Sequence, residues 1–141
     1  MALAQIIYVS RPAQRMSADE LTELVEASEK RNAKRDITGT LLYSAGNFMQ
    51  LLEGELTDIG NVFERVRCDA RHTEVRALLH KNVTKRLYPE WGMLQMDIGR
   101  SAPLNLGRME RMIYEVRQSR DTQQFGIEAR MLLSDFRLQL A

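Results

Sequence analysis

A glutamine and a tyrosine stand in apolar runs where β-strands would bury them. Gln50 shares a strand face with Phe48 and Leu52, because successive side chains of a strand alternate between faces. A neutral amide on such a face costs free energy unless a hydrogen bond satisfies it. Tyr8, within the aliphatic run Gln5–Ser10, supplies a hydroxyl that both donates and accepts. The pair predicts a polar site beneath the core, although most lone buried polar groups only satisfy a nearby backbone group.

Three further side chains extend this candidate site. Asn32 continues the apolar stripe of a predicted helix by one turn, and Trp91 and Met93 share a face of a later strand. With Tyr8 and Gln50 they supply a phenol, two amides, an indole and a thioether. That set suits a planar heterocycle with carbonyl and ring-nitrogen acceptors, and it suits neither an anion nor a metal ion. For Met93 alone, filling the core is the simpler interpretation, because methionine packs into irregular gaps.

The other reactive side chains form no recognisable catalytic or metal-binding set. Glu53 and Glu55 are near neighbours, but general acid–base catalysis needs a cleft and a partner that the sequence does not place. His72 and His80 have no thiol close by, which argues against a metal site. The single cysteine, Cys68, excludes an intrachain disulfide, and we expect a buried, inert thiol near the end of a helix. Neither a dinucleotide-binding nor a P-loop motif occurs.

Composition sets the class of protein. The 141 residues suffice for one domain, and 44% hydrophobic with 28% charged residues is typical of a soluble globular chain. A net charge of +1 argues against bulk binding of nucleic acid. No apolar stretch approaches the ~18 residues of a membrane span, and the start lacks a basic segment. We therefore expect a cytoplasmic protein with neither nucleic acid nor membrane as a partner.

Periodicity predicts the elements that position these side chains. Ser17 and Glu20 form a capping box that opens the first helix. The patterns predict strands over residues 5–10, 40–44, 48–53, 75–85 and 91–96, and helices from residue 18 and over 57–69. The order β-α-β-β-α-β-β, with two helices on one face of a mixed sheet, predicts an α+β, ferredoxin-like sandwich.

The segment 98–141 predicts two additional helices that belong to the same globular unit. The strands are apolar on both faces, since Ile7, Val9, Met49 and Leu51 point away from the face of Tyr8 and Gln50. A sheet of this kind cannot leave one face in water. We expect the C-terminal helices to cover the far face or to lie at a subunit interface. These helices carry more apolar side chains than one sheet face needs, among them Met109, Met112, Met131 and Leu132. Any of these side chains that stay exposed would serve a partner.

Several separated motifs together resemble the BLUF family of flavin-based blue-light sensors. They are Ile7-Tyr8-Val9-Ser10-Arg11, Asn32 followed by Ile37-Thr38-Gly39-Thr40-Leu41-Leu42-Tyr43, Phe48-Met49-Gln50-Leu51-Leu52-Glu53-Gly54, Asp69-Ala70-Arg71-His72 and Trp91-Gly92-Met93. The resemblance runs in order from about residue 3 to residue 97, and it implies a flavin-binding domain over 1–97. Gly92 departs from the serine of many members, which leaves the site intact but puts the freedom of the last strand in doubt.

The resemblance also implies roles for particular residues. The buried tyrosine and glutamine of the family fall on Tyr8 and Gln50, and its flavin-binding asparagine falls on Asn32. Its movable tryptophan and methionine fall on Trp91 and Met93. Arg65 and Asp69 fall where the family has polar groups near the flavin. The implied cofactor is FAD, with FMN or riboflavin as possible substitutes.

The function implied by this resemblance is light sensing without catalysis. After light absorption, an electron and a proton leave the tyrosine side and return, and Gln50 is left with a changed hydrogen-bond pattern through amide rotation or tautomerisation. Short, single-domain members signal to separate proteins, so we expect a separate effector and a homo-oligomer. Two other classes stay open: a flavin reductase or small hydrolase that works in the dark, and a light-blind oligomerisation or adaptor module.

Overall fold

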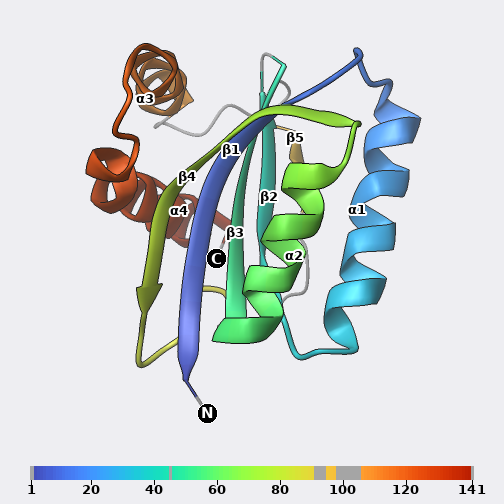
Figure 1. Cartoon of the computed structure of the whole chain (residues 1–141), viewed down its shortest axis with the longest axis vertical. Coiled ribbons are helices and arrows are strands. Elements are labelled where there is room, and N and C mark those ends of the chain that lie inside the picture. The colour runs from blue at the N-terminus through green and yellow to red at the C-terminus, as the bar shows by residue number, and fades with distance from the viewer. Residues whose placement is uncertain (1, 45, 91–94, 98–105, 141) are drawn as a thin grey trace.

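A sheet lies between two layers of helices (Figure 1). The computed structural model describes residues 2–44, 46–90, 95–97 and 106–140. Its strands are β1 (Leu3–Pro12), β2 (Thr38–Ser44), β3 (Asn47–Glu55), β4 (His72–Asn82) and β5 (Gln95–Asp97). Its helices are α1 (Ala18–Ala33), α2 (Leu56–Cys68), α3 (Leu106–Gln118) and α4 (Gly126–Leu140), with a 3-10 turn, η1 (Gln123–Phe125), before α4.

The strand order confirms the predicted ferredoxin-like topology. The order is β4-β1-β3-β2-β5, so β1 and β3 occupy the middle of the sheet. β1 pairs antiparallel with β3 and β4, and β3 pairs antiparallel with β2. β5 joins the edge parallel to β2, which makes the sheet mixed. The two central strands are therefore the ones that carry Tyr8 and Gln50.

Each face of the sheet packs against its own pair of helices. On the near face, α1 and α2 cover alternate residues of the central strands such as Ile6, Tyr8 and Leu52. On the far face, α3 and α4 cover the opposite set, as Figure 1 shows. The far-face core comprises Ile7, Val9, Leu42, Met49 and Leu51 from the sheet and Met109, Met112, Ile113, Val116, Ala129, Leu132, Leu133 and Phe136 from the helices. The expectation that the C-terminal helices cover the far face is confirmed, within this one chain.

Local sequence signals explain where the near-face helices begin. The Ser17 hydroxyl accepts from the Glu20 backbone N–H, and the Glu20 carboxylate accepts from the Ser17 backbone N–H, both at 3.1 Å. This reciprocal capping satisfies two donors that a helix start leaves unpaired. At the start of α2, Glu55 accepts from the backbone N–H of Asp58 at 3.1 Å. Gly54, the residue before Glu55, lets β3 pass close under α2, because a Cβ there would meet the side chains of Ile37 and Ile59 at 3.3 Å.

One expectation about the helices is wrong. Cys68 is exposed, not buried. It is the last residue of α2, and the apolar side of that helix ends at Val66, which packs against the near-face core. The helical spacing that buries Val66 turns Cys68 to solvent.

Glu53 is a buried carboxylate that joins four parts of the fold. It lies on the far face, fully buried, and its two oxygens accept from Gln5 Nε2 at 2.7 Å and from the backbone N–H groups of Leu87 at 2.6 Å and Tyr88 at 2.7 Å. Gln5 in turn accepts from Arg130 Nε on α4 at 3.0 Å. The carboxylate thus ties β1, β3, the segment after β4 and α4 together, which is a structural role and not a catalytic one.

We expect Glu53→Gln to destabilise the fold by about 1–3 kcal/mol. The substitution keeps the size of the side chain, but it replaces one acceptor oxygen by an NH₂ group that faces an N–H donor and removes the charge that strengthens the remaining bonds. Urea unfolding followed by circular dichroism measures the change. Glu29→Gln, at an exposed position of α1, is the control. Equal free energies of unfolding for the two variants would contradict the assigned role.

Candidate functional site

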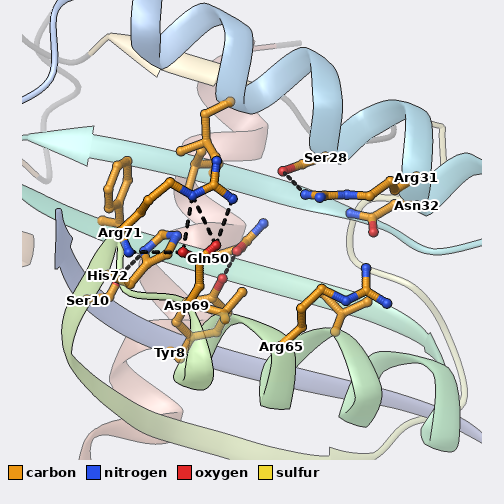
Figure 2. A pocket seen from close by; sticks show the side chains of 15 residues that line it. Tyr8, Ser10, Ser28, Arg31, Asn32, Gln50, Arg65, Asp69, Arg71 and His72 are labelled. Carbon is orange, nitrogen blue, oxygen red and sulfur yellow. Dashed lines mark hydrogen bonds and ion pairs between the residues drawn. The ribbon is translucent and has the colours of Figure 1, made fainter. Parts of the chain in front are cut away.

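A cleft opens between α1 and α2 on the near face of the sheet (Figure 2). Its volume is about 80 Å³. Tyr8, Leu41, Phe48 and Gln50 form the floor, from the three strands β1, β2 and β3. The walls come from α1 (Leu24, Ser28, Arg31 and Asn32) and α2 (Val62, Arg65 and Val66), and one end is closed by Asp69, Arg71 and His72. The amide and hydroxyl groups of this cleft are suited to orient a ring by hydrogen bonds.

Tyr8 and Gln50 meet on the floor of this cleft. They are direct partners in the antiparallel ladder between β1 and β3, so the backbone itself sets their side chains next to each other. The Tyr8 hydroxyl donates to Gln50 Oε1, and the two residues are 1% and 7% exposed. The phenol is therefore the hydrogen-bond partner that the amide of Gln50 requires.

The phenol of Tyr8 is held in its neutral form. Burial raises its pKa well above the ordinary value, because the cleft floor solvates a phenolate poorly. The ring also lies against Phe63 of α2, with centroids 5.3 Å apart. At any working pH, Tyr8 consequently keeps the proton that it donates to Gln50. A neutral phenol in a dry site can give up an electron together with that proton.

Asn32 presents an amide to the cleft with no partner in the described part of the chain. The residue is 4% exposed, and no hydrogen bond reaches its side chain from any described residue. Its backbone carbonyl accepts from the N–H groups of Arg35 at 3.1 Å and Ile37 at 3.0 Å, which fixes the end of α1. A ligand in the cleft can donate to and accept from this amide.

At the closed end, Asp69 and Arg71 form a two-pronged ion pair. Arg71 Nε lies 3.1 Å from both carboxylate oxygens of Asp69, and Nη2 lies 2.7 Å from Oδ2. The side-chain and backbone hydrogen bonds from Arg71 lower the pKa of Asp69 to about 2. Asp69, predicted as a flavin contact, thus lines the cleft already paired with a cation.

His72 closes the same end of the cleft. Its Nδ1 lies 3.4 Å from the Ser10 hydroxyl, and its ring centroid lies 5.7 Å from that of Phe48. Burial lowers the pKa of His72 below the usual value for histidine. Sequence reasoning did not assign Arg71 or His72 to the site. The two-residue spacing of Asp69 and Arg71 at a helix end was the signal that could have included Arg71.

Trp91 and Met93, predicted as the movable residues of the site, and Met93 also as a flavin contact, lie outside the described residues, as does Gly92. The nearest described part of that strand is β5, whose Gln95 pairs with Leu41. Leu41 lines the cleft and pairs on its other side with Gln50. The place of Trp91 and Met93 in the site stays a prediction. Arg65, by contrast, is described and lies on the cleft wall, and its contact with the flavin stays a prediction.

Comparison with known families decides what this cleft belongs to. A family model described as sensors of blue light using FAD matches residues 3–94. The chain belongs to the BLUF family. It is 38% identical over 90 residues to the photoactivated adenylate cyclase subunit beta of Euglena gracilis, an alignment that covers 63% of this chain and 10% of that protein. It is 29% identical over 96 residues to the blue light- and temperature-regulated antirepressor BluF of Escherichia coli, covering 68% of this chain and 24% of that one. This BLUF chain therefore spans about a tenth of the length of the cyclase subunit.

Solved structures of BLUF proteins share the fold. The BLUF protein BlrB in its dark state superposes with a TM-score of 0.65 and 28% identity, over 81% of this chain and 96% of BlrB. The BlrP1 BLUF structure gives a TM-score of 0.70 and 28% identity, over 96% and 90% of the two chains. A bacterial light-regulated adenylyl cyclase gives a TM-score of 0.72 and 27% identity, over 82% of this chain and 34% of the cyclase.

The residues of the BLUF cleft fit a flavin ring in kind. The apolar wall side chains of Leu24, Val62 and Val66 suit the ring faces, and the amides of Asn32 and Gln50 suit its polar edge. The volume of about 80 Å³ is smaller than the ~300–1,000 Å³ of typical ligand pockets, so the cleft has to widen as a ring enters. No helix among the described residues is long and apolar enough to cross a membrane. Within the same residues, no group of three acidic, histidine or cysteine side chains is placed to hold a metal ion.

The depressed pKa of Asp69 predicts how the closed end of the cleft responds to acid. A carboxyl whose pKa in the folded chain is about 2, against an ordinary 3.8, favours the folded arrangement above pH ~4 and loses that contribution as the pH falls towards 2. We expect a carbon NMR titration to find Asp69 still ionised at pH ~3. Arg71→Gln should return the pKa of Asp69 towards 3.8. A midpoint near 4 in the unaltered chain would show that the ion pair does not persist in solution.

Proposed function

We propose that this BLUF chain binds FAD and acts as a blue-light switch through Tyr8 and Gln50, without turning over a substrate. The observation that carries the proposal is the buried bond from the Tyr8 hydroxyl to Gln50 Oε1, in a cleft that also holds the amide of Asn32, which has no partner among the described residues. Asn32 is the proposed anchor for the pyrimidine edge of the ring. Arg65 is the proposed polar contact at the rim, and Asp69 with Arg71 the proposed contact at the closed end. FMN or riboflavin would serve the same chemistry.

A bound flavin supplies blue-light absorption and a place for one electron and one proton. Tyr8 is the proposed donor of both, since its buried phenol is neutral and cannot act as a preformed phenolate. Gln50 lies on the path because its carbonyl already accepts the phenolic hydrogen. When the electron and the proton have returned to Tyr8, no covalent bond joins the protein to the flavin and no product leaves. The lasting change is in the orientation or tautomer of the Gln50 amide.

The two amide arrangements form a two-state element. In one, the oxygen of Gln50 faces the Tyr8 hydroxyl; in the other, the opposite end of the amide does. Both can satisfy the phenol, which donates and accepts, so their free energies are close. A changed set of donors toward a bound chromophore alters its absorption. The proposed switch thus depends on the planar amide of Gln50, which carries a hydrogen-bond donor at one end and an acceptor at the other.

Gln50→Leu should abolish the reversible red shift that blue light causes, while flavin still binds. Leucine keeps nearly the same volume but removes both donor and acceptor. Absorption spectra before and after blue illumination measure the shift, and the flavin-to-protein absorbance ratio confirms loading. A normal photocycle in Gln50→Leu would overturn the hydrogen-bond mechanism.

Tyr8→Phe is the companion variant to Gln50→Leu, because it removes only the hydroxyl and leaves the ring against Phe63. Its flavin should be loaded but unproductive, with a longer fluorescence lifetime, since the electron donor is lost. The same preparations test the other two classes of function. Dark oxidation of a nicotinamide cofactor would favour a flavin reductase, and a folded protein that takes up no flavin would favour a light-blind adaptor.

The proposed output is a separate effector protein reached through α3 and α4, with a homo-oligomer as the proposed assembly. Of the apolar side chains expected at this surface, Met109, Met112 and Leu132 are buried in the far-face core, and Met131 is 56% exposed. Tyr114 and Ile127 are exposed on the same two helices. The relatives named for cyclase and antirepressor functions support an effector in general, and its identity in this protein is open to experiment.

A hydrogen-bonded connection links the switch strands to α4. Gln5 lies three residues before Tyr8 in β1, and its ladder partner Glu53 lies three residues after Gln50 in β3. Because three is an odd number of residues, Gln5 and Glu53 face the opposite side of the sheet. A displacement of β3 against β1 would therefore reach Arg130 on α4, which donates to Gln5 at 3.0 Å. This route complements the one predicted through Trp91 and Met93.

Arg130→Met should leave the light-induced red shift intact and reduce the light-dependent change in hydrogen exchange along residues 126–137. Methionine preserves much of the apolar stem but cannot donate to Gln5. Hydrogen exchange with mass spectrometry, in the dark and under light, measures the response. Arg111→Met, at an exposed position of α3, is the matched control. The connection would be excluded if the unaltered protein and Arg130→Met gave the same difference between light and dark.

A further inference from the structure

We propose that Arg31, Lys34, Arg35 and Arg65 bind the phosphate groups of the flavin nucleotide, so that this BLUF chain prefers FMN and FAD to riboflavin. The inference rests on the proposed flavin-binding function and assigns the part of the cofactor that the ring cleft does not hold. The four residues line a second hollow, of about 210 Å³, at the end of the cleft where α1 finishes.

The second hollow is continuous with the ring cleft. Arg31, Asn32, Val62 and Arg65 line both cavities. Figure 2 shows Arg31 and Arg65 extending from opposite walls, with Asn32 beside Arg31. Asn32 is buried and Arg31 is exposed, so consecutive residues of α1 offer an amide to the interior and a cation to the rim. A ligand whose ring is held at Asn32 has its nearest cationic surroundings here.

The electrostatics of the neighbouring hollows favour this end over the other. The second hollow is lined by four cationic side chains and no carboxylate. A third hollow, of about 350 Å³, adjoins the cleft near Arg71 and His72; Arg31 lines it too, but so do the carboxylates of Glu20 and Glu23. Its additional arginine, Arg71, is already paired with Asp69. The carboxylates of Glu20 and Glu23 repel a phosphate, and a phosphate that binds Arg71 would have to displace the carboxylate of Asp69.

The four cations are also uncommitted. In the part of the chain that the structure describes, none of them forms an ion pair, and the one hydrogen bond of Arg31 is a long 3.4 Å contact to the Ser28 hydroxyl. Elsewhere Arg71, Arg86 and Arg117 each pair with a carboxylate. Guanidinium groups bind phosphate oxygens through paired, charge-assisted hydrogen bonds. The like charges around this hollow repel one another until an anion arrives.

Helix ends do not by themselves account for the cluster. Basic residues near a helix C-terminus gain about 0.3–1 kcal/mol from the helix dipole, which favours Arg31 in the last turn of α1 and Arg65 in that of α2. That effect acts on each helix separately. It does not require side chains of both helices to line one hollow, and it does not place Arg35 there, since Arg35 lies beyond the end of α1.

The test compares flavins that differ in phosphate content. Apoprotein is titrated with riboflavin, FMN and FAD, and binding is followed by quenching of flavin fluorescence. FMN should bind about tenfold more tightly than riboflavin, as expected for charge-assisted hydrogen bonds at an exposed site. Raising the salt concentration should narrow the difference, because exposed charges are screened. The double variant Lys34→Gln, Arg35→Gln, whose residues line the second hollow but not the ring cleft, should lose most of the preference and keep its affinity for riboflavin.

Arg67→Gln is the matched control, because Arg67 is exposed on α2, pairs with Glu64 and lines none of these hollows. Equal affinities for riboflavin and FMN in the unaltered chain would overturn the proposal, and so would equal loss of both flavins in the double variant. Blue-light spectra of the riboflavin-loaded protein distinguish failure of the phosphate site from failure of the proposed light-sensing function. A normal red shift with no phosphate preference would overturn the phosphate site alone, whereas absence of any flavin binding would overturn the proposed function as well.

Discussion

The pairing of Tyr8 with Gln50 in the central ladder is the constraint on which the rest of the fold depends. Two polar side chains are buried on one face of the sheet, and they are tolerated because the antiparallel register of β1 and β3 places them directly opposite each other. An aliphatic pair at these positions would close the sheet face, and the cleft would have no polar floor. A shift of one residue in the register would turn each side chain to the other face. The fold therefore has to hold β1 and β3 in the middle of the sheet, with neighbours on both sides.

A central strand of this kind can serve two faces at once. Even-numbered residues of β1 and β3, such as Tyr8 and Gln50, face the cleft, whereas Gln5 and Glu53 face α4. The burial of Glu53 demands several donors, and the chain supplies them from Gln5 and from the backbone after β4. The same geometry that satisfies this carboxylate couples the strands mechanically to the C-terminal helices. Helices that merely covered apolar surface would respond far less to a small strand displacement.

Sequence patterns predicted those features of the molecule that depend on short-range periodicity. Alternation in the strands gave the two faces, and the Ser17 capping box gave the start of α1. The errors and omissions involve partners that are distant along the chain. The role of Glu53 depends on Leu87 and Tyr88, more than thirty residues away, and no local pattern announces it. The burial of Cys68 was predicted wrongly because helix ends turn quickly from core to solvent. That the Asn32 amide has no partner among the described residues could be seen only in three dimensions.

The distribution of charge around the cleft is compatible with the proposed switch at Gln50. Two amide orientations of Gln50 can be close in free energy only if no strong unbalanced charge favours one end of the amide dipole, since a charge acts strongly in a poorly solvated site. The titratable groups of the cleft meet this condition. Burial keeps the Tyr8 phenol neutral and lowers the pKa of His72, and the Asp69 carboxylate is compensated by Arg71. Arg31 and Arg65, which form no ion pair with any described residue, lie on exposed parts of the helices, where water screens them from the floor. Charge is thus confined to the rim of the cleft, and the neutral interior leaves the amide free to occupy either arrangement.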